Sequence, residues 1–212
     1  SGDVAYERDG IVYDTPKMNY SMLSTLLFVA AENNCKLTVL DFGGSLGTTY
    51  NHKKQYLESV HDLHWCIVEQ AHYVEAGRKE FEHERLHFYY SLEECLQHHQ
   101  PDIIIFSGVI QYIEKTYELL DQIKNSGVKY LYIDYIAFND EDRDRIAIQH
   151  VPPAFYGVPA SYTCWFYSKP KFYAYLQQHY HLVYDFIVDP DKYYLQLKPF
   201  QYEGQFWKLK SN

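Results

Sequence analysis

The chain has 212 residues, enough for one domain with a substantial buried core but too few for two. Its formal net charge is −9, and its lysines and arginines are scattered among acidic residues, so the basic stripe that grips nucleic-acid phosphates is missing. The same charge opposes binding to an anionic membrane surface. With no apolar run of about 18 residues and no signal peptide, the sequence predicts a cytoplasmic protein.

The cysteines are far apart along the chain and form no CxxC pair. This favours reduced thiols over a zinc site or a disulfide framework. The opening Ser1-Gly2 is typical of the remnant of an expression tag. We expect residues 1–18 to form an N-terminal extension of a single domain that spans residues 1–212.

The first two thirds of the chain alternate between amphipathic and continuously apolar segments, which predicts helices on both faces of a parallel sheet. Asn19 and Ser21 are candidate N-caps of the first helix, and Gly127 is a candidate C-cap. The expected helices are Tyr20–Glu32, Thr48–Val60, Ala71–His83, Leu92–His98 and Tyr117–Asn125. The expected strands are Leu37–Phe42, His64–Val68, Leu86–Tyr89, Asp102–Phe106 and Tyr130–Ile136.

The last third departs from this rhythm. Residues 137–169 are rich in proline and aromatic residues, and we expect them to form a lid-like insertion. A helix is predicted at Pro170–His179 and a strand at Leu182–Val188. Strands at Tyr193–Leu197 and Gln205–Lys210 complete the prediction, with an antiparallel pair at one edge of the sheet.

The segment Asp41–Gly47 is the most informative stretch of the sequence. A buried strand that ends in Gly43-Gly44 and passes into a helix brings bare backbone close to a ligand at the carboxyl edge of the sheet. The next strand ends in Glu69, 28 positions after Asp41 (69 − 41). An acidic side chain there can accept hydrogen bonds from both hydroxyls of a ribose. Together these features predict a nucleoside site.

Two cofactor classes compete for this site. A dinucleotide requires a GxGxxG turn, so that a helix N-terminus faces the pyrophosphate. The spacing from Gly43 to Gly47 does not match that pattern. A methyl donor such as S-adenosylmethionine carries no phosphate and tolerates the looser turn, so it is the favoured cofactor.

Several motifs occur together: Leu40–Gly47, Val68-Glu69-Gln70, Ser107–Tyr112, Gln149–Pro152 and Tyr202–Phe206. In this combination the chain resembles a family of class I methyltransferases often encoded among bacterial surface-polysaccharide genes. The resemblance covers nearly the whole chain from about Tyr6. It implies a Rossmann-like α/β sandwich with a seven-stranded, mostly parallel sheet and an antiparallel last strand.

The resemblance also implies positions for S-adenosylmethionine. The turn residues Asp41, Gly43, Gly44, Ser45 and Gly47 would surround its methionine end, and Glu69 would bind the ribose. The adenine would lie against Gln70, Ser91 and Leu92, and the amino-acid group and sulfonium against Ser107 and Gly108. Two departures stand out: Ser45 replaces the usual second glycine of the turn, and the acid often found after the third strand is replaced by Ser91 and Leu92.

Methyl transfer needs an aligned acceptor and a group that takes its proton. His150 is the first candidate base, since an imidazole titrates near neutral pH, and Asp134 at the end of the fifth strand is the second. Aromatic and amide side chains that could contact the acceptor are Gln111, Tyr112, Tyr156, Tyr162 and Trp165.

No metal site is predicted, because the pairs His61–His64, His83–His87, His98–His99 and His179–His181 lack carboxylate or cysteine partners at ligand spacing. The family resemblance implies that the function is O-methylation of a carbohydrate or of a surface-polysaccharide precursor. The alternatives are a non-catalytic Rossmann-fold partner in a polysaccharide assembly complex and an NAD-type oxidoreductase.

Overall fold

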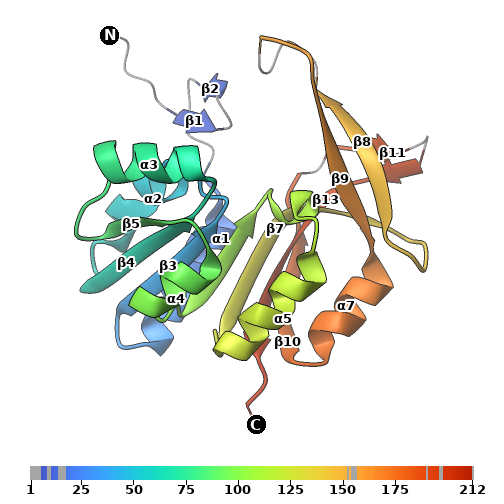
Figure 1. Ribbon diagram of the computed structural model, residues 1–212. Helices are drawn as coiled ribbons and strands as arrows, with labels where there is room; N and C mark the ends of the chain where they lie inside the picture. Colours follow the sequence, from blue (N-terminus) through green and yellow to red (C-terminus); the bar gives the residue numbers. More distant parts are fainter. Residues whose placement is uncertain are drawn as a thin grey trace.

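A central twisted sheet carries helices on both faces, and a long β-hairpin extends beyond one end of it (Figure 1). The computed structural model describes residues 18–151, 153, 157–189, 191–195 and 198–211, together with the backbone of residues 6–8 and 11–13. Those two short segments are β1 (Tyr6–Arg8) and β2 (Ile11–Tyr13), which pair antiparallel.

Among the described residues the main sheet has nine strands, of which seven lie side by side in the order β10-β13-β7-β6-β3-β4-β5 and two form a hairpin joined to β7. Along this seven-strand path β13 is antiparallel to both of its neighbours, and the other six strands share one direction. The predicted mostly parallel sheet with an antiparallel last strand is therefore confirmed. The bounds are β3 Lys36–Phe42, β4 Asp62–Val68, β5 Leu86–Tyr89, β6 Ile103–Ser107, β7 Tyr130–Asn139, β10 Tyr180–Ile187 and β13 Tyr202–Leu209.

The helices divide between the two faces because neighbouring strand residues point to opposite sides. Val39 belongs to the core under α1, α2 and α3, whereas Leu40 belongs to the core under α4, α5 and α7. The helices are α1 Tyr20–Glu32, α2 Thr48–Lys53, α3 Ala71–Glu80, α4 Leu92–His98, α5 Thr116–Ser126 and α7 Lys169–Gln177, with 3-10 turns η1 Lys54–Leu57 and η2 Ile110–Tyr112. None of the helices in the described ranges is long and apolar enough to cross a membrane.

Local capping follows the sequence closely. The Asn19 side chain accepts a hydrogen bond from the Met22 amide at 2.9 Å and caps α1. Gly127 ends α5 in the left-handed conformation, with φ +77. Both predicted caps are confirmed, whereas Ser21 lies within the first turn of α1.

Two predicted elements have different bounds. The helix expected at Thr48–Val60 stops at Lys53, and the tighter turn η1 follows and carries Leu57 into the core beside Tyr50. The strand expected at Tyr193–Leu197 is β11 (Tyr193–Leu195), which pairs with β12 (Lys198–Phe200) in a separate small sheet. The antiparallel partner of β13 at the sheet edge is instead β10.

Residues 137–169 contain two strands that the sequence analysis missed. They are β8 (Arg145–Val151) and β9 (Ala160–Ser168), which pair antiparallel, and the end of β9 runs parallel to the end of β7. Burial alternates along β8 between half-buried and exposed residues, which is the period of a strand with one covered face. This hairpin projects past the carboxyl ends of the parallel strands (Figure 1).

Candidate functional site

The turn after β3 needs glycine at specific positions for steric reasons. Gly43 and Gly47 have φ of +74 and +88, where residues with a Cβ are strained. A Cβ on Gly43 would lie 2.6 Å from Cγ2 of Val109, and a Cβ on Gly44 would lie 2.7 Å from Cγ of Asp41. Close packing thus holds the turn against the end of β3 and the segment after β6.

Ser45 is the residue of this turn that departs from glycine. Its φ is +53, a left-handed conformation that a residue with a Cβ adopts at a cost of about 1 kcal/mol. Its amide donates a hydrogen bond to Oε1 of Glu69 at 3.3 Å. Ser45 therefore connects the turn with the end of β4 and does so through its backbone.

Asp41 lies completely buried beneath the turn, with its Oδ2 3.1 Å from the indole nitrogen of Trp65 that donates to it. Burial raises the pKa of this carboxyl from 3.8 to about 7, and the Trp65 hydrogen bond and the charge of Lys53 oppose the rise. The charges of Asp134 and Glu69 raise the pKa further, so the four ionisable groups share one site. Asp41 therefore supports the turn from below, and its carboxyl group is half protonated near neutral pH.

Glu69 lies at the end of β4 with its carboxylate over the turn. Besides the bond from Ser45, its Oε2 accepts a hydrogen bond from the Gln70 amide at 2.7 Å. The Glu69 amide donates to the Tyr89 carbonyl at the end of β5, which fixes the backbone. Gln70 itself is exposed. The structure therefore brings Glu69 to the glycine turn, as its spacing from Asp41 predicted.

The end of β6 forms the other side of the site. Ser107 lies in register with Asp134 of β7, and the Gly108 amide donates to the Asp134 carbonyl at 3.0 Å. The fully buried Asp134 carboxylate accepts hydrogen bonds from Asn19 at 2.7 Å and from the Tyr132 hydroxyl at 3.1 Å, both to Oδ2. Asn19 thus anchors the start of α1 to the carboxyl edge of the sheet.

The strand β7 is irregular directly after Asp134. Tyr135 has a φ of +53, and the pairing of β7 with β13 shifts register opposite it, between Glu203 and Gln205. Such a bulge redirects the strand and stores backbone strain, and strained residues concentrate at functional sites. Beyond this irregularity β7 continues to Asn139, where it pairs with β9.

The hairpin contacts the site through η2. The Tyr112 hydroxyl donates to Oε1 of Gln149 in β8 at 2.8 Å, and its ring lies 6.2 Å from the ring of Tyr162 in β9. Gln111 is buried, and its amide nitrogen donates to the Gly108 carbonyl at 3.1 Å. The structure therefore groups Gln111, Tyr112 and Tyr162, three of the candidate acceptor residues.

Other candidate residues lie elsewhere. His150 is exposed on the opposite face of β8 from Gln149, and its Nδ1 lies 3.0 Å from the Ser161 hydroxyl. Trp165 packs with Tyr167 at the base of the hairpin, 6.4 Å between ring centroids. Tyr156 lies outside the described residues.

The two residues expected beside the adenine have structural roles. The Ser91 hydroxyl caps α4 by accepting from the Glu94 amide at 3.1 Å, and Leu92 is buried in the core under α4. Ser91 is half-buried at the start of α4, directly after the end of β5, so its position remains compatible with the prediction.

Sequence reasoning missed three contributors to this site. Lys53 is buried in α2, and its charge acts on Asp41. Asn19 and Gln149 contact the site from segments distant in sequence. The capping motif identified Asn19 as a helix start, but no local signal connects it with Asp134, 115 positions away.

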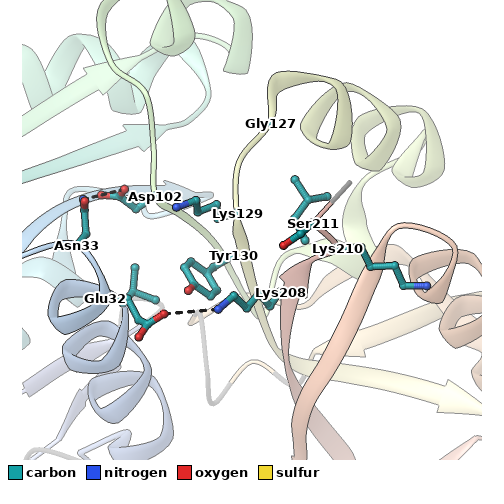
Figure 2. A pocket seen from close by; sticks show the side chains of 11 residues that line it. Glu32, Asn33, Asp102, Gly127, Lys129, Tyr130, Lys208, Lys210 and Ser211 are labelled. Atoms are coloured by element: carbon teal, nitrogen blue, oxygen red, sulfur yellow. Dashed lines mark hydrogen bonds and ion pairs between the residues drawn. The ribbon is translucent and has the colours of Figure 1, made fainter.

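A separate hollow of about 380 Å³ lies at the opposite edge of the sheet (Figure 2). Four of its polar side chains form two pairs: Lys208 lies 3.5 Å from Glu32, and Asn33 donates to Asp102 at 3.0 Å. In addition Asp102 accepts from the Thr38 amide at 2.8 Å. These charges already serve the fold, so the chemistry points to the carboxyl edge instead.

Comparison with protein-family models finds no match, and comparison with curated proteins finds none either. Solved structures do match over most of the chain. One is Burkholderia thailandensis 1,6-didemethyltoxoflavin-N1-methyltransferase with bound 1,6-didemethyltoxoflavin and S-adenosylhomocysteine, with a TM-score of 0.52 and 13% identity over 90% of this chain and 79% of that chain. The chain has the class I methyltransferase fold.

Two further structures support this fold assignment. A S-adenosylmethionine-dependent methyltransferase from Clostridium acetobutylicum matches with a TM-score of 0.54 and 13% identity, over 92% of this chain and 94% of that chain. The N-terminal domain of EvdMO1, in the presence of S-adenosylhomocysteine and D-fucose, matches with a TM-score of 0.57 and 11% identity, over 97% of this chain and 90% of that chain. At such low identity the similarity concerns the methyltransferase fold alone.

Proposed function

We propose that this protein is an S-adenosylmethionine-dependent methyltransferase that binds its cofactor at the carboxyl ends of β3, β4 and β6. The observation that carries the proposal is the position of the Glu69 carboxylate beside the turn that contains Gly43 and Ser45. In this fold the ends of the first two strands are where a nucleoside is expected. Structures of the same fold hold S-adenosylhomocysteine.

Each part of the turn has a role in the proposal. The turn from Gly43 to Gly47 would lie along the methionine end of the cofactor, with Asp41 as its support and Gly44 in contact with it. Glu69 would accept hydrogen bonds from the ribose hydroxyls, and Gln70, Ser91 and Leu92 would lie around the adenine. Ser107 and Gly108, on the other side, would face the amino-acid group and the sulfonium.

Methyl transfer is a direct displacement: the acceptor atom forms a bond to the methyl carbon as the bond from carbon to sulfur breaks, and the acceptor loses a proton. The protein therefore aligns the acceptor and receives that proton. Of the two candidate bases, Asp134 lies at the carboxyl edge beside Ser107, whereas His150 points away from Tyr112 on the hairpin. We propose that Asp134 accepts the proton that the acceptor loses.

We further propose a hydroxyl group of a carbohydrate, or of a polysaccharide precursor, as the acceptor. Tyr112 of η2 and Tyr162 of β9 provide aromatic rings suited to the apolar face of a sugar, and Gln111 and Gln149 provide amide groups suited to its hydroxyls. The structure of the EvdMO1 domain determined in the presence of D-fucose supports this acceptor class for the fold.

One observation favours a non-catalytic Rossmann-fold partner as the second candidate. The Glu69 carboxylate already accepts hydrogen bonds from Ser45 and Gln70 within the protein. A ribose has to compete with these amides for the carboxylate, which lowers the gain from each new hydrogen bond. A protein that keeps this closed arrangement would bind the methyl donor weakly.

Calorimetric titration with S-adenosylmethionine, S-adenosylhomocysteine and NAD distinguishes the candidates. The proposal requires binding of the first two compounds and none of NAD. Glu69→Ala should weaken S-adenosylhomocysteine binding by about 100-fold, because two hydrogen bonds to a charged acceptor are worth about 3 kcal/mol together. The matched control is Glu75→Ala on the exposed side of α3, which should bind like the wild type.

Turnover is measured as transfer of radiolabelled methyl groups to a panel of monosaccharides and oligosaccharides. Asp134→Asn should bind the cofactor and lose transfer, while His150→Gln should retain both. Failure of the wild type to bind S-adenosylhomocysteine would overturn the cofactor assignment. Binding without transfer to any sugar in the panel would overturn the acceptor class and leave the cofactor assignment standing.

A further inference from the structure

Three imidazoles from distant parts of the sequence meet on the outer part of the sheet, below α4. His64 comes from β4, His87 from β5, and His99 from the C-cap of α4. Their ring centroids are 5.7 Å apart for His64–His87, 5.1 Å for His64–His99 and 4.9 Å for His87–His99. One nitrogen from each ring can be chosen such that all three lie within 4.8 Å of one another.

Two of these rings each have a buried nitrogen with no hydrogen-bond partner among the described residues. The atoms are Nδ1 of His64 and Nε2 of His87. An unpaired buried polar atom costs about 1–3 kcal/mol, so it calls for an explanation by something the site would hold. Two such atoms in one cluster point to a shared ligand that accepts lone pairs.

The opposite nitrogens of the same rings are held by the protein. Nε2 of His64 lies 3.1 Å from Oδ1 of Asp62, and His87 makes a hydrogen bond with the backbone of Glu84. Because Nε2 of His87 has no partner within the part of the chain that the structure describes, the Glu84 bond belongs to its Nδ1. A carboxylate or carbonyl on the far nitrogen fixes the tautomer and leaves the near nitrogen as a lone pair, which is the usual arrangement around a metal-bound histidine.

The surroundings of two of the rings favour the neutral form. Burial lowers the pKa of His99 to about 4, with the neighbouring His87 and His64 contributing in the same direction. Burial likewise lowers the pKa of His87. Neutral imidazole is the form that binds a metal, so both lowered pKa values act in the direction of metal binding.

We infer that His64, His87 and His99 form a binding site for a divalent late transition metal of the zinc class. Three imidazole nitrogens suit Zn²⁺, Cu²⁺, Ni²⁺ and Co²⁺, and do not suit Mg²⁺ or Ca²⁺. Nitrogens around tetrahedral Zn²⁺ lie about 3.4 Å apart, given bonds of about 2.0–2.1 Å, so each pair needs to approach by no more than about 1.4 Å. All three residues are half-buried, so water can supply a fourth ligand.

The site is independent of the proposed methyltransferase function. His64 lies in β4 and precedes Glu69, which directly follows that strand, by five residues (69 − 64), a distance of about 16 Å in extended chain. A metal here would tie the C-terminal end of α4 to β4 and to the edge strand β5. Its expected role is to stabilise this corner of the fold.

The test is titration of the tag-free full chain with Zn²⁺ alone at pH 7.5, followed by calorimetry and thermal unfolding. We expect one Zn²⁺ per chain and a melting temperature that rises with Zn²⁺ concentration, because the metal binds the folded state. His87→Gln and His99→Gln should each weaken binding at least tenfold, and Asp62→Asn should weaken it by about 10–100-fold. The matched control is His61→Gln, an exposed histidine just before β4.

The first result to obtain is Zn²⁺ binding by the wild-type protein, because an absence of binding would overturn the inference. Circular dichroism shows whether each variant is folded, and the two histidine variants and Asp62→Asn serve as alternatives to one another. If every folded variant binds Zn²⁺ as tightly as the wild type, the metal sits elsewhere and the assignment is wrong. A Co²⁺ absorption spectrum with nitrogen-type tetrahedral bands, lost in His99→Gln, would support it.

Discussion

The buried carboxyl of Asp41 gives the protein a distinctive dependence of stability on pH. Its pKa is about 7 in the folded protein and 3.8 when exposed in the unfolded chain. Between these values the folded state keeps a proton that the unfolded state has lost. The free energy of unfolding therefore falls as pH rises, and the contribution is fully present only below about pH 4. From pH 5 to pH 8 the expected loss is about 3 kcal/mol, because the slope of about 1.4 kcal/mol per pH unit applies up to the folded pKa and vanishes above it.

Asp41→Asn isolates this contribution. The amide is neutral at every pH, and its oxygen can still accept the hydrogen bond from Trp65. The variant should therefore gain about 3 kcal/mol relative to the wild type between pH 5 and pH 8, while contributions from other ionising groups cancel in the difference. The measurement is urea unfolding followed by tryptophan fluorescence and circular dichroism at several pH values.

The control for this series is Glu58→Gln, because Glu58 is exposed at the end of η1. It should follow the wild type at every pH. If the curves of Asp41→Asn and the wild type run parallel from pH 5 to pH 8, Asp41 is not protonated in the folded protein at pH 5, and its environment is more polar than the structure indicates.

Two further stability predictions concern the edges of the site. Ser45→Gly should raise the free energy of unfolding by about 0.5–1 kcal/mol, seen as a melting temperature about 2 °C higher. The reason is that glycine tolerates the φ of +53, while the backbone hydrogen bond to Glu69 is kept. A lower melting temperature would contradict this. Asn19→Ser keeps a capping oxygen but cannot reach Asp134, so the free energy of unfolding should fall by about 2 kcal/mol from the loss of that contact. Asn19→Ala also removes the cap and should lose about 1 kcal/mol more in the same denaturation experiment. Equal losses in the two variants would mean that the cap contributes nothing.

The sheet could be predicted because its strands are buried on both faces. The run Ile103–Phe106 is continuously apolar and unmistakable as a central strand. The β8–β9 hairpin is different, since each strand has one covered and one exposed face. Its alternation, with Ile146 and Ile148 exposed, was hidden by the prolines and aromatic residues around it. The content of proline and aromatic residues led to the prediction of a lid-like insertion, whereas the alternating pattern of exposure along β8 is that of a strand.

The candidate site shows the same division between local and distant signals. The glycine turn and Glu69 lie at the ends of adjacent strands, so the rule that ligands bind at the carboxyl edge was sufficient to bring them together. Asn19, by contrast, reaches Asp134 only because α1 begins at that edge. The packing of a helix against a sheet has no counterpart in local sequence spacing, and contacts of this kind have to be observed.

The histidines illustrate how strand register creates a site that spacing conceals. The sequence analysis considered His61–His64, His83–His87 and His98–His99 as separate local pairs and found no ligand pattern in any of them. In the structure one residue of each pair comes together: His64, His87 and His99. The strands β4 and β5 are neighbours, with Cys66 in register with His87, and α4 returns across both of them. Ligands that come from neighbouring strands need no regular spacing along the chain.

The same reasoning from strand geometry separates the two candidate bases. Along β8 the half-buried residues are the odd-numbered ones, and Gln149 is the residue that reaches Tyr112 beside the end of β6. Successive side chains of a strand point to opposite faces, so His150 is on the other side of the hairpin because it follows Gln149 by one position. Moving His150 to the site would require a shift of one residue in the pairing of β8 with β9, which would expose Ala147 and bury Ile148. Asp134 needs no such rearrangement, because the parallel register with Ser107 already sets it at the carboxyl edge.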